Sequence, residues 1–293
     1  MLFGAIEAGG TKFICGVGTG PDDLRTIRIP TADPEPTIAA AIAFLREAGG
    51  SNLRAIGIGS FGPICTDRRS PKWGYITSTP KTAWRDCDLA GPIQKAFGIP
   101  VGFDTDVNAA ALGEARWGAA RDGEDSVYLT VGTGIGGGAI VAGRLVHGMS
   151  HPEMGHIRLP HEGAFAGVCP YHGDCLEGLA SGPAIHARWG KPAEELPEDH
   201  PAWATEARYL ALAIVNFATV LSTGRVILGG GVMRHASLYP AIRNEVARLL
   251  NGYIEPPAIV PPELGDRAGV CGALAMAEDT VRDTPARKSS SPH

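Results

Sequence analysis

Two β-strands joined by a glycine turn are predicted by IEAGGTKFICGV, the segment that spans residues 6–17. Apolar residues fill both strands, and Gly9, Gly10 and Thr11 lie between them in a tight turn. Consecutive glycines allow backbone N–H groups to approach an anion closely, and the Thr11 hydroxyl and Lys12 ammonium groups can both bind phosphate. An ordinary hairpin turn can have the same residues, so this turn alone leaves both interpretations open.

The same pattern occurs a second time around LTVGTGIGGG, residues 129–138. Strands at residues 127–131 and 138–141 flank a turn at residues 132–137, and a third glycine group, residues 229–231, follows another strand. Repeated α/β units of this kind predict two similar lobes, with the binding site in the cleft between them. Three glycine turns in comparable places favour phosphate binding over three unrelated hairpin turns.

Apolar periodicity and the positions of Gly and Pro predict the remaining elements. The expected strands are residues 2–8, 12–17, 24–29, 55–59, 101–104, 127–131, 138–141 and 225–228. The expected helices are residues 35–48, 89–97, 109–117, 201–221, 239–250 and 268–281. These elements give an α/β fold with an N-terminal lobe at residues 1–115, completed by a C-terminal helix at about 268–282, and a C-terminal lobe at residues 116–267. Residues 283–293 are rich in Ser and Pro, and we expect a disordered tail there.

Glycine is the unusual residue in the composition, because the chain has 40 glycines among its 293 residues, about twice the typical share of ~7%. Hydrophobic residues make up 44% of the chain and charged residues 19%, which is enough apolar material for a sizeable core. The net charge of −5, without basic runs, argues against nucleic acid or an anionic membrane as the main partner. The uncharged residues 126–143 are long enough to span a membrane, but six of them are glycine, and we expect strands there. The N-terminus lacks the features of a signal peptide, and the six cysteines indicate a reducing cytoplasm.

Other phosphate-binding motifs do not fit this chain. Gly132, Gly134 and Gly137 match G-x-G-x-x-G, but a dinucleotide-binding loop opens a helix, whereas an apolar strand is expected here. The sequence contains no G-x-x-x-x-G-K-[ST], which excludes a Walker-type NTPase, and no H-R-D or D-F-G, which excludes a protein kinase.

A carboxylate at the start of a helix is predicted by VGFDTDVN, residues 101–108. Asp106 and Asn108 lie at the N-terminus of the expected helix, where the helix dipole and free N–H groups favour an ionised carboxylate. Such a carboxylate can accept a proton from a hydroxyl group whose oxygen attacks phosphorus. The alternative is that Asp106 or Asn108 serves only as an N-cap.

A metal site is predicted in the loop of residues 151–180, which contains the motif C-x2-H-x2-C. The candidate ligands are His156, Cys169, His172 and Cys175. Two thiolates and two imidazoles suit tetrahedral Zn2+, and four protein ligands leave no open position, so this zinc would be structural. Free thiols or a redox pair are the alternatives, and His151 or His161 could replace His156 as the fourth ligand.

Taken together, these motifs resemble those of the ROK sugar kinases, a family within the sugar kinase/actin/Hsp70 superfamily. The resemblance covers roughly residues 3–281. Its motifs are IEAGGTK (6–12), SFGPI (60–64), DTDVNAAALGE (104–114), LTVGTGIGGG (129–138), HPEMGHIRLP (151–160), CPYHGDCLEGLASGPAI (169–185) and LGGGV (228–232). GYITSTPKTAW (74–84) and the CPYHGDC form are most similar to the bacterial fructokinase branch. The chain departs from many members at Glu7, where they have Asp, and in its C-x2-H-x2-C motif, where they have C-x-C-x4-C.

The resemblance implies a two-lobed actin-like ATPase (ribonuclease H-like) fold and ATP-dependent phosphorylation of D-fructose at the 6-hydroxyl. Asp106 corresponds to the general base, and Glu7 would contact the Mg2+ of MgATP through water. The residues expected to bind ATP are Gly9, Gly10, Thr11, Lys12, Thr133, Gly134, Pro183, Gly229, Gly230 and Gly231. The residues expected to bind the sugar are Asn108, Glu153, His156, Glu177, Gly62 and Pro63, with His156 also a zinc ligand.

The resemblance further implies a cytoplasmic homodimer whose small-molecule partners are MgATP and the sugar. Within the family, the alternative is a hexokinase that acts on mannose, glucose or an N-acetylhexosamine. A sugar-responsive ROK repressor would need a helix-turn-helix segment before the phosphate turn, and the turn begins at Gly9. An actin-like filament ATPase would not need Glu153, Glu177 or the zinc loop.

Overall fold

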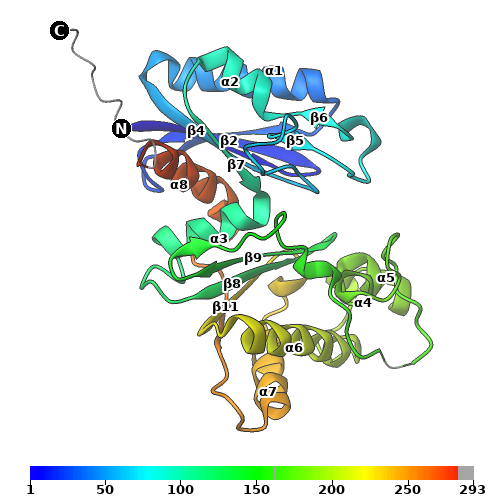
Figure 1. Ribbon diagram of the computed structural model, residues 1–293. Coiled ribbons are helices and arrows are strands. Elements are labelled where there is room, and N and C mark those ends of the chain that lie inside the picture. Colours follow the sequence, from blue (N-terminus) through cyan, green and yellow to red (C-terminus); the bar gives the residue numbers. More distant parts are fainter. Residues whose placement is uncertain (162, 283–293) are drawn as a thin grey trace, which may run out of the picture. The chain divides into compact units, whose positions relative to one another are not determined.

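The computed structural model describes residues 1–161 and 163–282 and contains two five-stranded sheets and a small two-stranded one (Figure 1). The chain divides into two compact units, each built around one of the larger sheets. Unit 1 consists of Met1–Ala109 and the residues from Gly269 onward, and unit 2 consists of Ala110–Ala268. The predicted tail, residues 283–293, lies outside the described residues.

The sheet of unit 1 has the strand order β3-β2-β1-β4-β7. β2 pairs antiparallel with both β1 and β3, whereas β1, β4 and β7 are parallel. The strands are β1 (Leu2–Ala8), β2 (Lys12–Gly18), β3 (Arg25–Pro30), β4 (Leu53–Ser60) and β7 (Val101–Thr105). The helices are α1 (Pro34–Ala48), α2 (Ala90–Phe97) and α8 (Ala268–Arg282), and the small sheet joins β5 (Tyr75–Ile76) to β6 (Cys87–Asp88).

Helices cover both faces of this sheet, with α1 and α2 on one face and α8 on the other (Figure 1). The strands therefore need apolar residues on both faces, and Ile6 and Ile58 are fully buried. Gly57 of β4 lies under α8, where an added Cβ atom would be only 1.8 Å from the Ala273 carbonyl oxygen. Only glycine allows the helix to approach the sheet this closely.

The sheet of unit 2 repeats the arrangement, with the order β10-β9-β8-β11-β12. β9 pairs antiparallel with β8 and β10, and β8, β11 and β12 are parallel. The strands are β8 (Ser126–Val131), β9 (Ile135–Val141), β10 (Arg144–Leu145), β11 (Arg225–Gly229) and β12 (Ala258–Val260). The helices are α4 (Leu176–Ala180), α5 (Gly182–Trp189), α6 (Ala202–Leu221) and α7 (Leu238–Leu250). The predicted internal duplication is thereby confirmed at the level of the two sheets.

The predicted boundaries were wrong at two places that matter for the site. The helix expected from residue 109 is α3 (Asp106–Trp117), so Asp106 and Asn108 lie in its first turn. The strand expected from residue 138 is β9, which begins at Ile135, so the second glycine turn is short and Gly137 belongs to the strand. An added Cβ atom at Gly137 would lie 2.6 Å from Leu129 Cδ2 and 2.8 Å from Met154 Sδ, so packing explains why glycine occurs in this strand.

The uncharged residues 126–143 form the β8–β9 hairpin, as predicted. In the described part of the chain, one helix, α6, is long and apolar enough to cross a membrane by length and composition. Half of its most apolar window is buried, and Leu210 and Ile214 belong to the core of unit 2. This packing is the kind expected of a core helix.

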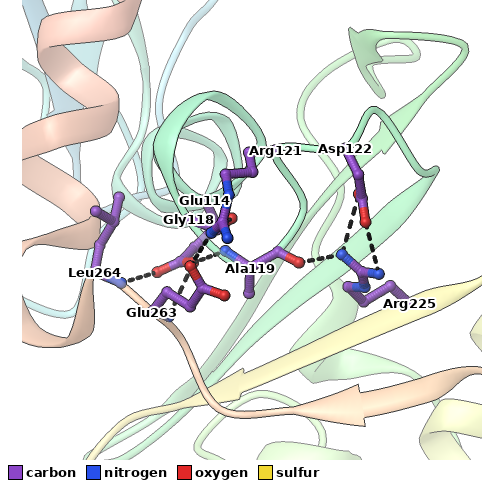
Figure 2. A network of polar contacts seen from close by, with 8 residues as sticks. All are labelled: Glu114, Gly118, Ala119, Arg121, Asp122, Arg225, Glu263 and Leu264. Carbon is purple, nitrogen blue, oxygen red and sulfur yellow. Dashed lines mark hydrogen bonds and ion pairs between the residues drawn. The ribbon is translucent and has the colours of Figure 1, made fainter.

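A buried carboxylate joins the end of α3 to the segment that leads into α8 (Figure 2). The Glu114 side chain is fully buried, and its Oε2 accepts hydrogen bonds from Ala119 N at 2.7 Å and Glu263 N at 3.1 Å. Its Oε1 accepts from Leu264 N at 2.9 Å. An added Cβ atom at Gly118 would lie 2.0 Å from Glu114 Oε2, so a glycine is needed beside this carboxylate. Glu114 thus fixes two distant chain segments within unit 2.

We expect Glu114→Gln to destabilise the protein by about 2–4 kcal/mol, because an amide N–H2 replaces an oxygen that faces backbone N–H donors. Urea unfolding followed by circular dichroism measures the change. The matched control is Glu255→Gln on the exposed surface, which we expect to change the free energy of unfolding by less than about 0.5 kcal/mol. Equal stability of the two variants would contradict the structural role of Glu114.

Candidate functional site

Three segments of unit 1 meet at one edge of its sheet, because β1, β4 and β7 are parallel and end in register. Ala8 pairs with Ser60, and Ser60 pairs with Thr105. The residues that follow these strands are therefore neighbours at the carboxyl edge, where α/β sheets bind ligands. Two strand spacings separate the glycine turn after β1 from Asp106 after β7, a distance of roughly 10 Å.

The first glycine turn is closed and anchored by backbone hydrogen bonds. Gly9 N donates to Lys12 O at 3.0 Å, which closes the turn. Thr31 holds it from the side, because its Oγ1 donates to Gly9 O at 2.8 Å and its N donates to Thr11 O at 3.0 Å. Thr11 is exposed and Lys12 is half-buried, so a hydroxyl and an ammonium group border a rigid turn. This arrangement suits the binding of an anion.

Asp106 is the first residue of α3, and Thr105 serves as the helix cap. Thr105 Oγ1 accepts a hydrogen bond from Asn108 N at 3.0 Å, which is the geometry of an N-cap. Thr105 therefore caps the first turn of α3. Sequence reasoning missed Thr105, although a Thr at the end of a strand and before a helix is a recognised capping signal.

Asp106 is half-buried, and its Oδ1 accepts from the adjacent Val107 N at 2.9 Å. The helix N-terminus favours the carboxylate form of this side chain, which is the form that accepts a proton. A carboxylate in this environment can act as a general base toward a hydroxyl group.

Asp104 and Asn108 form a buried pair beneath this turn of the helix. Asp104 Oδ1 accepts from Asn108 Nδ2 at 2.7 Å and from Thr105 N at 2.8 Å. The Asn108 side chain is fully buried, so its amide group supports the start of α3. A direct contact of Asn108 with the sugar stays a prediction.

The remaining predicted residues of unit 1 lie next to β1. Phe61 N donates to Ala8 O at 2.8 Å, which brings the following Gly62 and Pro63 beside the end of β1. Both residues are half-buried, and Pro63 O accepts hydrogen bonds from Thr77 N and Oγ1 at 2.8 and 2.9 Å. Glu7 lies on β1 and packs against the start of α8, where a Cβ atom at Gly269 would be 2.5 Å from Glu7 Cδ.

In unit 2, three glycine-containing segments lie together at the carboxyl edge of the sheet. The turn after β8 is closed by Gly132 N, which donates to Gly134 O at 2.9 Å. Gly182 N, at the start of α5, donates to Gly132 O at 2.8 Å. Gly230, after β11, has φ of +94°, and an added Cβ atom there would lie 2.3 Å from Val131 O. The structure therefore brings together the predicted segments Gly132–Gly134, Gly182–Pro183 and Gly229–Gly231 within unit 2.

The backbone of Ile135, directly after this turn, is contacted from two sides. Ile135 N donates to Glu177 Oε2 at 2.9 Å, and an added Cβ atom at Gly155 would lie 1.7 Å from Ile135 O. Gly155 precedes His156, and Glu177 lies two residues after Cys175. The two segments that carry candidate metal ligands therefore both hold the residue that follows the glycine turn.

The Cys/His cluster of unit 2 has the dimensions of a tetrahedral zinc site. The candidate ligand atoms of His156, Cys169, His172 and Cys175 all lie within 4.8 Å of one another. The two Nδ1 atoms are 3.3 Å apart, and His156 Nδ1 lies 3.5 Å from Cys175 Sγ and 3.7 Å from Cys169 Sγ. Zn–S bonds of about 2.3 Å and Zn–N bonds of about 2.0–2.1 Å would place tetrahedral ligand atoms roughly 3.3–3.8 Å apart. The donor types and these three separations therefore suit a zinc ion.

The two nitrogen atoms of His156 face different groups. Nδ1 belongs to the Cys/His cluster, and Nε2 lies 4.0 Å from Glu153 Oε2. His151 instead pairs with Glu153, at 3.4 Å, and His161 pairs with Asp174, at 3.7 Å, so neither replaces His156 in the cluster. Burial raises the pKa of the Cys175 thiol to about 11, so metal binding would have to displace its proton.

Comparison with known proteins places this arrangement among sugar kinases. The ROK family model matches residues 3–280. The chain is 46% identical to the fructokinase of Zymomonas mobilis, covering 94% of this chain and 96% of the relative. It is 44% identical to the fructokinase of Pediococcus pentosaceus, covering 97% of this chain and all of the relative. The crystal structure of ROK hexokinase from Thermus thermophilus is 31% identical with a TM-score of 0.81, and the match covers 97% of this chain and 100% of that one.

Proposed function

This chain belongs to the ROK family, and we propose that it is a fructokinase that transfers the γ-phosphoryl group of ATP to the 6-hydroxyl of D-fructose. Fructose as the substrate rests on the fructokinases that are 44–46% identical over nearly the whole chain. The single observation that carries the reaction type is the half-buried carboxylate of Asp106 at the same sheet edge as the Gly9–Gly10 turn.

Asp106 acts as the general base in this proposal. Its carboxylate accepts the proton of the fructose 6-hydroxyl while that oxygen forms a bond to the γ-phosphorus, and the bond from this phosphorus to the bridging oxygen of ADP breaks. The Thr105 cap and the Asp104–Asn108 pair orient the first turn of α3 and therefore the base.

The glycine turns bind the nucleotide. In this proposal Gly9, Gly10, Thr11, Lys12, Thr133 and Gly134 bind the phosphates, because glycines let backbone N–H groups approach an anion closely. Pro183 and Gly229–Gly231 of unit 2 lie near the adenosine. Mg2+ would be bound by the phosphates and neutralise their charge, with Glu7 contacting it through water.

In this proposal the sugar hydroxyls are bound by Glu153, His156, Glu177, Asn108, Gly62 and Pro63. Zinc would be held by His156, Cys169, His172 and Cys175, and it would supply a fixed geometry for the loop rather than chemistry. With Nδ1 of His156 on the metal, its Nε2 remains available to a sugar hydroxyl, and Glu153 lies next to it. The family also suggests a homodimer, which we include in the proposal.

We expect fructose to be the preferred substrate, with a kcat/KM at least about tenfold above that of mannose, glucose and N-acetylmannosamine, because one well-placed hydroxyl contact can discriminate by this factor or more. A coupled assay of ADP release with MgATP and each sugar measures the ratio. A higher kcat/KM for any of the other three sugars would identify a hexokinase of different specificity, and this result would overturn the fructose assignment.

A further inference from the structure

Buried contacts hold the loop of residues 79–84 in unit 1, which packs beside the phosphate turn. Its Trp84 is buried between Phe13 and Phe61, with ring centroids 5.4 and 5.7 Å away, and Trp84 Nε1 donates to Ala32 O at 2.9 Å. Thr79 at the other end is 1% exposed. Phe13 directly follows Lys12 of the phosphate turn, so the loop and the turn share one aromatic cluster.

Lys81 lies in this loop, and its side chain extends over Gly10. Thr79 Oγ1 accepts from Lys81 N at 3.3 Å, and Lys81 O accepts from Trp84 N at 2.9 Å, so the Lys81 backbone is held at both polar groups. An added Cβ atom at Gly10 would lie 3.1 Å from Lys81 Cε and 3.9 Å from its Cδ. The ammonium nitrogen is one bond beyond Cε, which places a second positive charge next to the turn that contains Lys12.

The charge of Lys81 is available to a ligand. Its side chain is exposed, and no ion pair joins it to a carboxylate among the residues that the structure describes. Lys72, nearby in the sequence, differs because its Nζ lies 2.8 Å from Asp86 Oδ1. A lysine that crosses a phosphate turn without a carboxylate partner is suited to bind phosphate oxygens.

We propose that Lys81 is a further catalytic residue, whose ammonium group donates hydrogen bonds to the oxygens of the phosphoryl group in transfer. This inference rests on the proposed phosphotransferase function. Negative charge on the transferred group and on the leaving oxygen must be stabilised as the bond to ADP breaks, and a preorganised cation acts most strongly at that stage. Asp106 takes the proton of the sugar hydroxyl, and Lys81 keeps its own protons throughout.

The position of the Lys81 side chain favours phosphate over sugar as its ligand. Its stem lies on Gly10, a residue of the phosphate turn. A transition-state contact lowers kcat when it is lost, whereas a sugar contact would raise the KM for fructose. The two roles therefore give different kinetic results.

The test compares Lys81→Met with Lys72→Met, which removes a charge from an exposed ion pair near the same loop. Removal of one transition-state donor typically costs 10²–10³ in rate, so we expect Lys81→Met to lower kcat by about 100-fold. The KM for fructose and the Kd for ADP should change by less than about threefold, because these measure ground-state binding. Binding of ADP with aluminium fluoride and fructose, which imitates the transferred phosphoryl group, should weaken by a factor similar to that in kcat. Lys72→Met should match the wild type in every measurement.

Three results would overturn the role of Lys81. The first is a kcat of Lys81→Met equal to that of the wild type. The second is an unchanged kcat with a raised KM for fructose. The third is that the variant binds ADP and ADP with aluminium fluoride more weakly by the same factor and also has a lower thermal unfolding midpoint. Failure of the proposed fructokinase function would give a different result from failure of the Lys81 role, because the wild type itself would then prefer another sugar. In that case the same comparison of variants is made with the preferred sugar. A wild-type protein that binds no ADP with aluminium fluoride would overturn both proposals.

Discussion

Asp106→Asn is expected to lower kcat by about three orders of magnitude or more while the fold and the affinity for ADP stay unchanged. General-base catalysis contributes about 10²–10⁴ to a rate, and an amide cannot accept the proton that the sugar hydroxyl must lose. Asn keeps the size of the side chain and can still accept from Val107 N, as Asp106 does at 2.9 Å. Steady-state kinetics with MgATP and fructose measures the loss, and thermal unfolding checks the fold.

The matched control for this variant is Asp67→Asn. Asp67 pairs with Arg69 on the surface of the same unit, and both side chains are exposed. Since exposed ion pairs contribute little, we expect Asp67→Asn to keep wild-type kcat within about twofold. If Asp106→Asn also retained this rate, Asp106 would not be the general base.

Removal of metal from the Cys/His cluster is expected to have the second-largest effect. Cys169, His172 and Cys175 lie in a loop in which Gly167 and Gly173 have positive φ, and little regular structure holds it. The binding energy of a structural zinc contributes directly to folding, so we expect loss of metal to lower the thermal unfolding midpoint by about 10 °C. Metal analysis of the purified protein and unfolding with and without 1,10-phenanthroline measure the stoichiometry and the effect.

The contacts around Ile135 add a second, separate consequence of metal loss. Gly155 and Glu177 both hold the Ile135 backbone, and each is next to a segment that carries a candidate metal ligand. We therefore expect Cys175→Ser to weaken the binding of a non-hydrolysable ATP analogue by about tenfold, since supporting contacts of a metal site contribute 10–100-fold. Cys65→Ser outside the cluster is the control, and it should change neither the thermal unfolding midpoint nor the affinity for the ATP analogue. A protein purified without zinc, or one whose midpoint does not respond to the chelator, would contradict the structural metal.

The duplicated sheets could be predicted because their signals are local. A strand, a glycine turn and a second strand lie within about a dozen residues in each unit, and the period of apolar residues identifies the strands. The Cys/His cluster could also be predicted from the sequence, since three of its candidate ligands lie in C-x2-H-x2-C. The structure brings His156 to them.

The boundaries of α3 and β9 could not be predicted because tertiary packing sets them. Residues 104–108 have low helix propensity, and the Thr105 cap together with the buried Asp104–Asn108 pair stabilises the first turn. Residues 136–138 are all glycine and have low strand propensity, yet pairing with β8 extends β9 back to Ile135. The short strand β12 was missed for a similar reason, since it has only three residues and pairs with β11.

The position of Lys81 beside Gly10 could not be predicted from the sequence for another reason. It lies about seventy residues after Gly10 in the chain, and nothing in the local sequence relates the two. The packing of Trp84 on Phe13 and Phe61 and its hydrogen bond to Ala32 O bring the loop to the phosphate turn. Contacts of this kind depend on the folded structure, as does the Glu177–Ile135 hydrogen bond.

We propose that this chain phosphorylates fructose at its 6-hydroxyl, with Asp106 taking the proton. The most direct test is nuclear magnetic resonance of the product formed from MgATP and uniformly 13C-labelled fructose by the wild type and by Asp106→Asn. We predict that the wild type gives one product whose phosphorus couples to C6, and that the variant gives almost none in the same time. Coupling to C1, a wild type that leaves fructose unphosphorylated, or equal product from both proteins would contradict the claim.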